Sequence, residues 1–335
     1  MQEASYYRRE GERVHCLLCP QDCHLADGKK GLCGVRLAED GKLFTTNYGK
    51  YAAAAMDPIE KKPLYHFYPG HSIFSLGTVG CNLSCSFCQN WTLARSQERV
   101  LQKITPEKIC SFLEKRPSRE QLGVAYTYNE PFIWFEFVLA CSRVLSEQGF
   151  HNVLVTNGFV RPDPLEELLP YIDAMNIDVK AFNEGFYQRW CRGNLEAVLQ
   201  TVQRAVKDCH VELTYLLIPT LNDDLAEVEK FINWVASLNP EIPVHFSRYY
   251  PQYKMDLPPT PLTTMEKVWE LAKKHLKYVY LGNIPDGEAN NTYCPSCGSL
   301  LLERRGYTVI NKGLKGTQCS HCSTALPIVG KIYSH

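Results

Sequence analysis

The sequence predicts an α/β fold, a partial or closed (β/α) barrel flanked by a small cysteine-rich unit on each side. Short apolar runs alternate with longer stretches of helical periodicity through residues 70–285, which is typical of parallel strands joined by crossover helices. Polar side chains follow these apolar runs at corresponding points. Eleven of the 15 cysteines fall into three groups, and two of the groups lie outside the alternating region.

The alternation defines the expected elements in order. The expected strands are 72–78, 122–127, 152–156, 174–179, 211–218, 243–248 and 278–282. The expected helices are 105–116, 131–148, 163–170, 194–208, 224–238 and 262–276. Pro106 suits the first turn of its helix, with Thr105 as the cap. We therefore expect a cysteine-rich N-terminal unit and lead-in at 1–69, a barrel at 70–285 and a C-terminal unit at 286–335.

Composition limits the classes of partner. The chain has 335 residues, with 36 basic and 36 acidic side chains, so its charge argues against a nucleic-acid or membrane-surface partner. No apolar run approaches 18 residues, and the first 16 residues are polar and charged. We therefore expect a cytoplasmic protein without a membrane span. In a reducing compartment, grouped cysteines are metal or redox ligands rather than disulfides.

The C-terminal cysteine group has the spacing of a zinc ribbon. Two C-x2-C pairs are separated by 21 residues, and the sequence between them reads as two short strands around a glycine turn. Four thiolates at this spacing typically hold one tetrahedral zinc ion. The expected zinc ligands are Cys294, Cys297, Cys319 and Cys322.

The N-terminal group is less regular, with cysteines separated by two, three and nine residues. Four thiols at these intervals fit either zinc or an iron–sulfur cluster. His15 and His24 stand beside two of these cysteines and are alternative ligands. The expected ligands are Cys16, Cys19, Cys23 and Cys33, with the metal left open.

The central group, Cys81, Cys85 and Cys88, is one ligand short of a complete metal site. A zinc site would need a fourth side chain, for which His66 and His71 are available. Alternatively, three thiolates hold a [4Fe–4S] cluster and leave one iron open. The group follows an apolar strand, so it lies at the end of the strand where barrels place their chemistry.

Polar side chains at the carboxyl ends of the expected strands are candidates for the same site. They are Glu130, Thr156, Asn157, Asp178, Lys180, His245 and Asn283. A single residue of this kind is more often a helix cap or a turn residue, but several in register favour a common rim. Cys191 lies near the loop after the fourth strand and is either a reactive thiol or simply buried.

The stretch "CNLSCSFC" resembles the radical SAM signature C-x3-C-x2-C, including an aromatic residue, Phe87, before the last cysteine. The resemblance implies that the open iron of the cluster is chelated by the amino and carboxylate groups of S-adenosylmethionine (SAM). It implies reductive cleavage of SAM to a 5′-deoxyadenosyl radical, which abstracts hydrogen from a substrate. It also implies an external electron donor such as flavodoxin or ferredoxin.

The resemblance implies roles for the residues at the rim. Glu130 would accept from the amino group of SAM, Lys180 would pair with its carboxylate, and Asp178 would hold Lys180 or a cation. The expected cofactor-binding set is Phe87, Glu130, Thr156, Asn157, Asp178, Lys180, His245 and Asn283. The expected catalytic residues are Lys180, His245 and Cys191.

Two branches of the superfamily are similar to longer stretches. "TNG" at 156–158, "DVK" at 178–180 and "PVH" at 243–245 are similar to stretches that contact or flank SAM in pyruvate formate-lyase activating enzymes. The ordered set "CLLCPQDC", "PIEKKPLYHFYPG", "YTYNEP", "IPTLNDD", "HFSRYYPQYKM" and "YLGNIP" resembles the radical SAM enzyme of the AmmeMemoRadiSam system. That system implies Memo-like and Ammecr-like partners, whereas the activases imply a glycyl-radical protein.

Two further classes of function remain open. One is a non-catalytic binding protein with three zinc sites, which would be colourless. The other is an electron carrier with two or three clusters, which would have no use for a polar rim. Detection of 5′-deoxyadenosine separates both from the enzyme.

Overall fold

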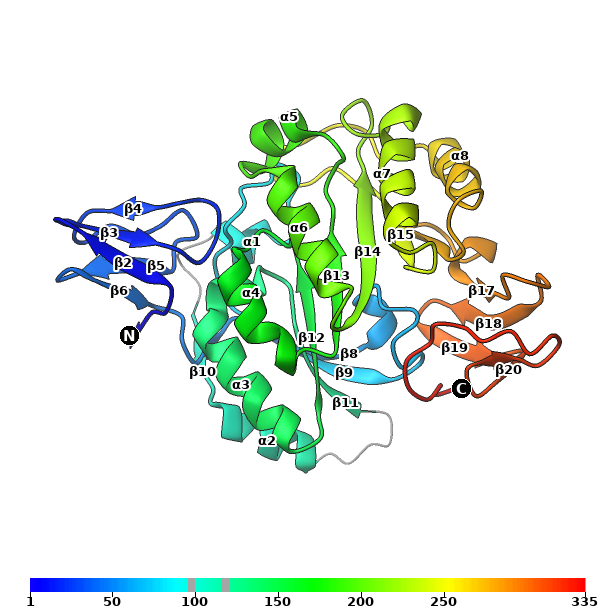
Figure 1. The fold of residues 1–335 in the computed structure, drawn as a ribbon, viewed down its shortest axis with the longest axis horizontal. Helices are drawn as coiled ribbons and strands as arrows, with labels where there is room; N and C mark the ends of the chain where they lie inside the picture. The colour runs from blue at the N-terminus through cyan, green and yellow to red at the C-terminus, as the bar shows by residue number, and fades with distance from the viewer. Residues whose placement is uncertain (96–99, 116–120, 335) are drawn as a thin grey trace.

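The computed structural model describes residues 1–95, 100–115 and 121–334. Eight strands form one sheet in the order β16-β15-β14-β13-β12-β11-β9-β8, so β16 and β8 are its edges and the barrel is partial (Figure 1). Strands β9 to β16 pair in parallel. The strand bounds are β8 (Ala53–Pro58), β9 (Ser72–Gly77), β11 (Gln121–Tyr126), β12 (His151–Thr156), β13 (Ala174–Asp178), β14 (His210–Leu217), β15 (Val244–Arg248) and β16 (Val279–Gly282).

Helices connect the parallel strands, and all but the short helices α1 and α5 lie where the periodicity predicts them. They are α1 (Trp91–Arg95), α2 (Pro106–Glu114), α3 (Phe135–Glu147), α4 (Pro162–Leu168), α5 (Glu184–Phe186), α6 (Leu195–Ala205), α7 (Leu225–Leu238) and α8 (Leu262–Ala272). Thr105 caps α2 by accepting from the backbone N–H of Lys108, as expected. Residue 116, the predicted end of that helix, lies outside the described ranges.

The two faces of the sheet differ in chemistry. Facing the helices, Tyr215, Phe231 and Phe246 pack ring against ring between β14, β15 and α7. On the opposite face, the hydroxyl of Thr214 donates to Asn176 Oδ1 at 3.0 Å. Because successive strand residues alternate between faces, the apolar core lies outside the barrel wall and polar side chains line its interior.

Strand β8 was not predicted, and it lies within the range expected for the N-terminal unit. It pairs antiparallel with β9 along its full length, from Ala53 opposite Gly77 to Pro58 opposite Ser72. Three consecutive alanines at its start give it low strand propensity and no alternating pattern. Its pairing with β9 therefore decides its conformation, which a local pattern does not reveal.

The N-terminal unit consists of two small antiparallel sheets, seen in dark blue in Figure 1. One contains β1 (Gln2–Glu3), β6 (Lys42–Thr45) and β5 (Arg36–Glu39), and the other contains β2 (Tyr7–Glu10), β3 (Arg13–Cys16) and β4 (His24–Leu25). A further short pair, β7 (Lys50–Tyr51) and β10 (Gln102–Lys103), lies between this unit and α2 in the chain.

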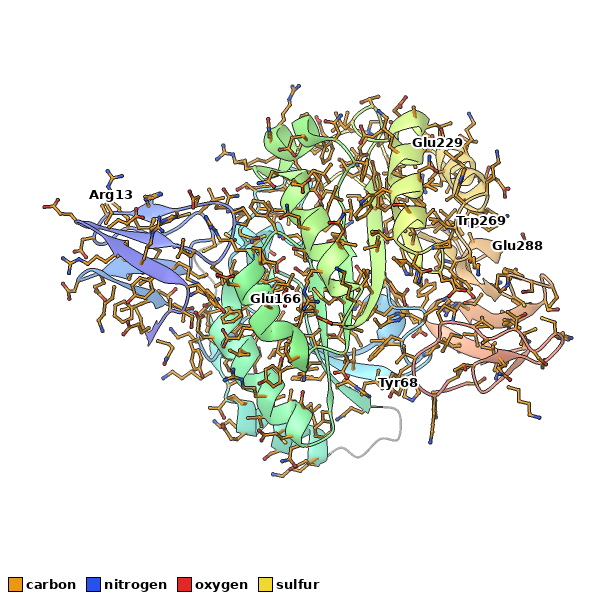
Figure 2. The ribbon with its side chains drawn as sticks, in the orientation of Figure 1. Arg13, Tyr68, Glu166, Glu229, Trp269 and Glu288 are labelled. Atoms are coloured by element: carbon orange, nitrogen blue, oxygen red, sulfur yellow. The ribbon has the colours of Figure 1, made fainter. Side chains whose placement is uncertain are left out.

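The C-terminal unit contains the two predicted strands of the ribbon. They are β18 (Leu300–Arg305) and β19 (Thr308–Asn311), joined at Gly306, whose φ is +57°. Strand β17 (Thr292–Tyr293) completes their sheet, and β20 (Leu314–Lys315) pairs with β21 (Gln318–Cys319). Tyr68 lies beside this unit in Figure 2, where its backbone N–H donates to Val329 O at 2.8 Å.

The segment 59–71 closes the barrel at the start of its strands. Glu212, the third residue of β14, accepts from the backbone N–H groups of Tyr65 (2.9 Å) and His66 (2.6 Å). Arg304 of the C-terminal unit is buried against the ring of Tyr65 and donates to its carbonyl. This segment therefore closes the end of the barrel opposite the cysteine loop.

No helix in the described ranges is both long and apolar enough to cross a membrane.

Candidate functional site

The loop of residues 81–88, called the cysteine loop below, follows β9 and carries the three central cysteines. Gly80 enters the loop with φ +95°, a conformation open to glycine at little cost. Cys81 Sγ accepts from the backbone N–H of Leu83 at 3.4 Å and lies 3.7 Å from Asn157 Nδ2. Burial raises the pKa of Cys81 and of Cys88, so these thiols need a metal or a cation to become thiolates.

A π-helical turn, Tyr187–Cys191, holds the cysteine loop from the side of β13. The carbonyls of Cys191 and Trp190 accept from Ser84 and Ser86 at 2.7 and 3.0 Å. Cys191 is fully buried. A side-chain hydrogen bond with Cys191, together with burial, raises the pKa of the Cys85 thiol well above its ordinary value. The structure therefore brings Cys191 into the site as a neighbour of Cys85.

Lys180 and Asp178 form an ion pair at the carboxyl end of β13. Their atoms Nζ and Oδ2 are 2.6 Å apart, and the lysine side chain is 16% exposed. Burial alone would lower the pKa of Lys180, but Asp178 and Cys85 outweigh it and raise the pKa. The structure thus places an ammonium group, paired with a carboxylate, beside the cysteine loop.

Glu130 joins the ends of β11 and β12. It accepts from Thr156 Oγ1 at 2.7 Å, from the backbone of Asn157 at 2.9 Å and from the backbone of Phe132 at 3.0 Å. Burial raises its pKa to about 7 despite these bonds. Glu130 is therefore the cap of the turn after β11, and it positions Asn157, whose amide reaches Cys81.

Three other candidates lie in different places. Phe87 is buried against Phe186, within the cysteine loop. Asn283 is exposed at the edge of the sheet, where its side chain donates to Arg248 O at 3.1 Å. His245 is the second residue of β15 and is bonded to Glu212 at 2.7 Å. His245 therefore lies inside the barrel near the start of β15, whereas Asn283 directly follows the carboxyl end of β16. Their roles toward SAM stay predictions, because a strand's sequence does not reveal the depth at which its side chains lie.

A buried polar group inside the barrel was not predicted. Asp57 on β8 binds Lys62 Nζ at 2.7 Å and accepts from the hydroxyl of Tyr128 at 2.8 Å. Burial raises the pKa of Tyr128 to about 12, aided by its bond to Asp57. Because the three residues come from separate segments, only the two adjacent lysines of "PIEKKP" hinted at such a group.

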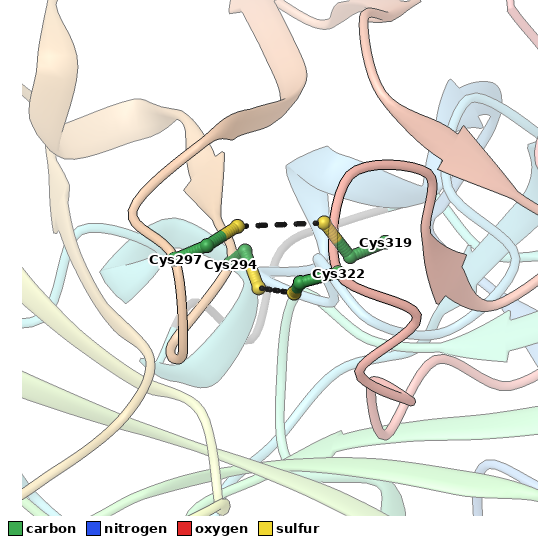
Figure 3. Close-up of side chains that lie close together, drawn as sticks. All are labelled: Cys294, Cys297, Cys319 and Cys322. Atoms are coloured by element: carbon green, nitrogen blue, oxygen red, sulfur yellow. Dashed lines mark hydrogen bonds between the residues drawn. The ribbon is translucent and has the colours of Figure 1, made fainter.

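The C-terminal cysteines converge on one point (Figure 3). All four sulfur atoms lie within 4.8 Å of one another. The sulfurs of Cys294 and Cys322 are 3.4 Å apart, and those of Cys297 and Cys319 are 3.7 Å apart. These separations match the distance of about 3.8 Å that follows from zinc–sulfur bonds of about 2.3 Å in a tetrahedron.

Of the N-terminal cysteines, Cys16, Cys19 and Cys33 are buried and Cys23 is half-buried. Cys33 contacts the start of the cysteine loop, since a Cβ on Gly80 would meet Cys33 O at 2.5 Å.

The sequence of the chain is similar to those of known proteins. Residues 75–235 match the Radical SAM superfamily. An uncharacterised protein of Methanocaldococcus jannaschii is 41% identical over 98% of this chain and 100% of its own. The pyruvate formate-lyase-activating enzyme of Clostridium pasteurianum is 25% identical over 62% of this chain and 95% of its own. The pyruvate formate-lyase 1-activating enzyme of Escherichia coli K12 is 28% identical over 46% of this chain and 69% of its own.

A solved domain of a pyruvate-formate lyase-activating enzyme from Bacteroides vulgatus aligns with 48% of this chain and 99% of its own, at 22% identity and a TM-score of 0.43. The match to the superfamily spans the cysteine loop and the strands from β9 to β14, the region in which the thiols, Lys180 and Asn157 meet. With its cysteine loop at the strand ends of a parallel sheet and activating enzymes among its relatives, the chain contains a radical SAM domain over residues 75–235.

Proposed function

We propose that this chain is an enzyme that reductively cleaves SAM and uses the resulting radical to abstract hydrogen from a substrate. The radical SAM domain implies a [4Fe–4S] cluster and SAM. The observation that carries the proposal is the meeting of three thiols and a charged lysine at the end of the parallel sheet. When bound, the cluster and SAM supply cleavage of the sulfonium to methionine and a 5′-deoxyadenosyl radical.

The residues around the cysteine loop fit such a cluster. Cys81, Cys85 and Cys88 would hold three irons. The charge of Arg95 acts on Cys81 and Cys88 and favours their thiolates. Its Nη2 is buried and has no partner among the described residues. An unpaired buried donor is costly, and a cluster sulfur would provide an acceptor.

The neighbouring side chains would bind and orient SAM. Lys180 would pair with the carboxylate of SAM, while Asp178 holds its ammonium in place. Asn157, fixed by Glu130 through its backbone, would position Cys81. Phe87 and Phe186 would exclude water below the loop. We expect Glu130 to act as a positioning residue, because its oxygens already accept three hydrogen bonds.

Two classes of substrate fit the proposed reaction. Similarity to activating enzymes supports a glycyl-radical protein whose glycine loses hydrogen. The extra cysteine units and the resemblance to the AmmeMemoRadiSam system instead support a small molecule or another protein side chain, with Memo-like and Ammecr-like partners. A flavodoxin or ferredoxin would supply the electron in either case. A glycyl radical formed in a co-incubated glycyl-radical protein would decide for the activase.

Anaerobic reconstitution, reduction and addition of SAM test the function. The wild type should release 5′-deoxyadenosine, and Cys85→Ala should lose both the central cluster and the cleavage. Cys209→Ala, which removes a thiol at the end of α6 remote from the loop, is the matched control and should retain both. Cleavage by Cys85→Ala, or a colourless wild type that holds about three zinc ions, would overturn the proposal.

A further inference from the structure

The four cysteines of the N-terminal unit lie close to one another. Cys16 donates its backbone N–H to Cys23 O at 3.0 Å. A methyl group on Gly31 would meet the sulfurs of Cys23 at 3.6 Å and of Cys33 at 3.8 Å. The backbone N–H of Asp22, the residue before Cys23, donates to Cys19 O at 3.4 Å. The four thiols are therefore close enough to interact.

The neighbouring histidines belong to the other face of the hairpin. His15 and His24 pair across β3 and β4, and their rings stack at 4.0 Å. Glu10 and Asp22 bind His15 on its two sides. Since successive strand residues point to opposite faces, Cys16 points away from this stack. The ligands on the face toward the barrel are thus thiols only.

The spacing of these thiols differs from that of the zinc-like group. The C-terminal cysteines have all four sulfurs within 4.8 Å of one another. Among the described residues, no three of the N-terminal cysteines form such a group, and neither do the three of the cysteine loop. A four-iron cube separates its sulfur ligands more widely than a single zinc ion does. The N-terminal set therefore has the wider spacing of the cysteine loop.

Two arginines lie beside these thiols, Arg36 buried and Arg95 half-buried. Arg36 interacts with Cys16 and Cys33, and its Nε is buried without a partner in the described part of the chain. Arg95 donates to Leu32 O at 3.2 Å, next to Cys33, while its charge acts on Cys81. Both arginines could donate to sulfur, an interaction that tunes iron–sulfur clusters.

The N-terminal cysteines also lie against the cysteine loop. Besides the contact of Gly80 with Cys33, the amide of Gln21 donates to Asn82 O at 2.8 Å. A cavity of about 330 Å³ at this junction is lined by Cys33, Gly80 and Arg95, among others. The two cysteine groups are thus joined by direct contacts.

We propose that Cys16, Cys19, Cys23 and Cys33 hold a second [4Fe–4S] cluster, adjacent to the cysteine loop. Such a cluster carries one electron at a time, so it would place a one-electron centre beside the barrel site. Its adjacency to a first cluster rests on the proposed function, whereas its iron content does not.

Metal content of the Cys81→Ala/Cys85→Ala/Cys88→Ala protein tests the site with the N-terminal unit intact. After anaerobic reconstitution with iron and sulfide, we expect about four iron atoms in this variant and about eight in the wild type, given four per cluster. Adding Cys16→Ala and Cys19→Ala should remove the remaining iron, whereas adding Cys209→Ala should not. Zinc in place of iron in the triple variant would overturn the proposal.

Electron paramagnetic resonance tests the adjacency. In the reduced wild type, two neighbouring clusters should broaden each other's signals, and the triple variant should show one unbroadened signal. Two independent signals in the wild type would contradict the adjacency. If the wild type releases no 5′-deoxyadenosine while the triple variant still holds four irons, the proposed function fails and this second site stands.

Discussion

The buried ion pair between Arg36 and Glu136 ties the N-terminal unit to α3. Two parallel hydrogen bonds of 2.7 and 2.9 Å join the guanidinium to the carboxylate. The arginine side chain is 1% exposed and the glutamate 9%. The backbone N–H of Ser5 also donates to Glu136 Oε1 at 2.7 Å. Glu136 therefore binds both sheets of the unit: it holds Arg36 in β5 of one sheet and Ser5, which precedes β2 of the other.

We expect Glu136→Gln to destabilise the protein by about 3 kcal/mol. The amide keeps the shape but turns one acceptor into a donor that faces the guanidinium, leaving Arg36 buried with an unpaired charge. Removing one partner of a buried pair typically costs about 3–5 kcal/mol. The lower end applies because glutamine keeps one side-chain oxygen, which can still accept a hydrogen bond from the guanidinium.

Urea unfolding followed by tryptophan fluorescence measures this cost. Trp134 is a nearby reporter, since its indole N–H donates to Asn47 O at 2.8 Å. Glu147→Gln, an exposed substitution on the same helix, is the control and should stay within about 0.5 kcal/mol of wild type. Adding Arg36→Met to Glu136→Gln should recover much of the loss. A Glu136→Gln protein as stable as the control would refute the reasoning.

Three further predictions concern other parts of the molecule. Glu130 has its pKa raised to about 7 in the folded protein, above its ordinary value of about 4.3; the folded state therefore binds the extra proton, and its stability declines as pH rises through this window. Glu130→Gln should flatten that decline in urea midpoints measured from pH 5 to 8, and an unchanged slope would contradict the assignment. Gly80→Ala should lower the melting temperature and the iron content, because its Cβ would meet Cys33 O at 2.5 Å, whereas Gly28→Ala, also at positive φ but with open space around it, should retain the iron. An equal iron content in the Gly80→Ala and Gly28→Ala variants would contradict a role of the contact between Gly80 and Cys33 in holding the iron. Chelation of the metal at the C-terminal cysteines should open that unit to trypsin at Arg305, observed by mass spectrometry, because small ribbons depend on their metal for folding; unaltered digestion would argue against a structural metal.

The elements of the barrel could be predicted because their signals are local. All seven parallel strands follow apolar runs, and the cap at Thr105 follows from adjacent residues. Strand β8 could not be predicted, since its alanines carry no alternating pattern and its conformation depends on β9. Local periodicity thus predicts an element where its own residues favour it, and fails where a partner strand decides.

The site divides in the same way. The cysteine loop was predictable from spacing, and Lys180 from its position after a strand. His245 follows the same kind of pattern, yet it lies deep in the barrel against Glu212. The group of Asp57, Lys62 and Tyr128 joins segments far apart in sequence. Depth along a strand and long-range polar contacts depend on the assembled barrel, so neither is readable from a short motif.

Residues 59–71 and Arg304 cover the end of the barrel at which its strands begin, and they form its floor. In the proposed reaction, the radical would form on the inner side of this floor, and substrates would reach it past the cysteine loop. The N-terminal unit lies next to the opposite, open end of the barrel, where it contacts the cysteine loop region. A substrate of the proposed reaction would have to pass the N-terminal unit, so the shape of this unit would help to select the substrate.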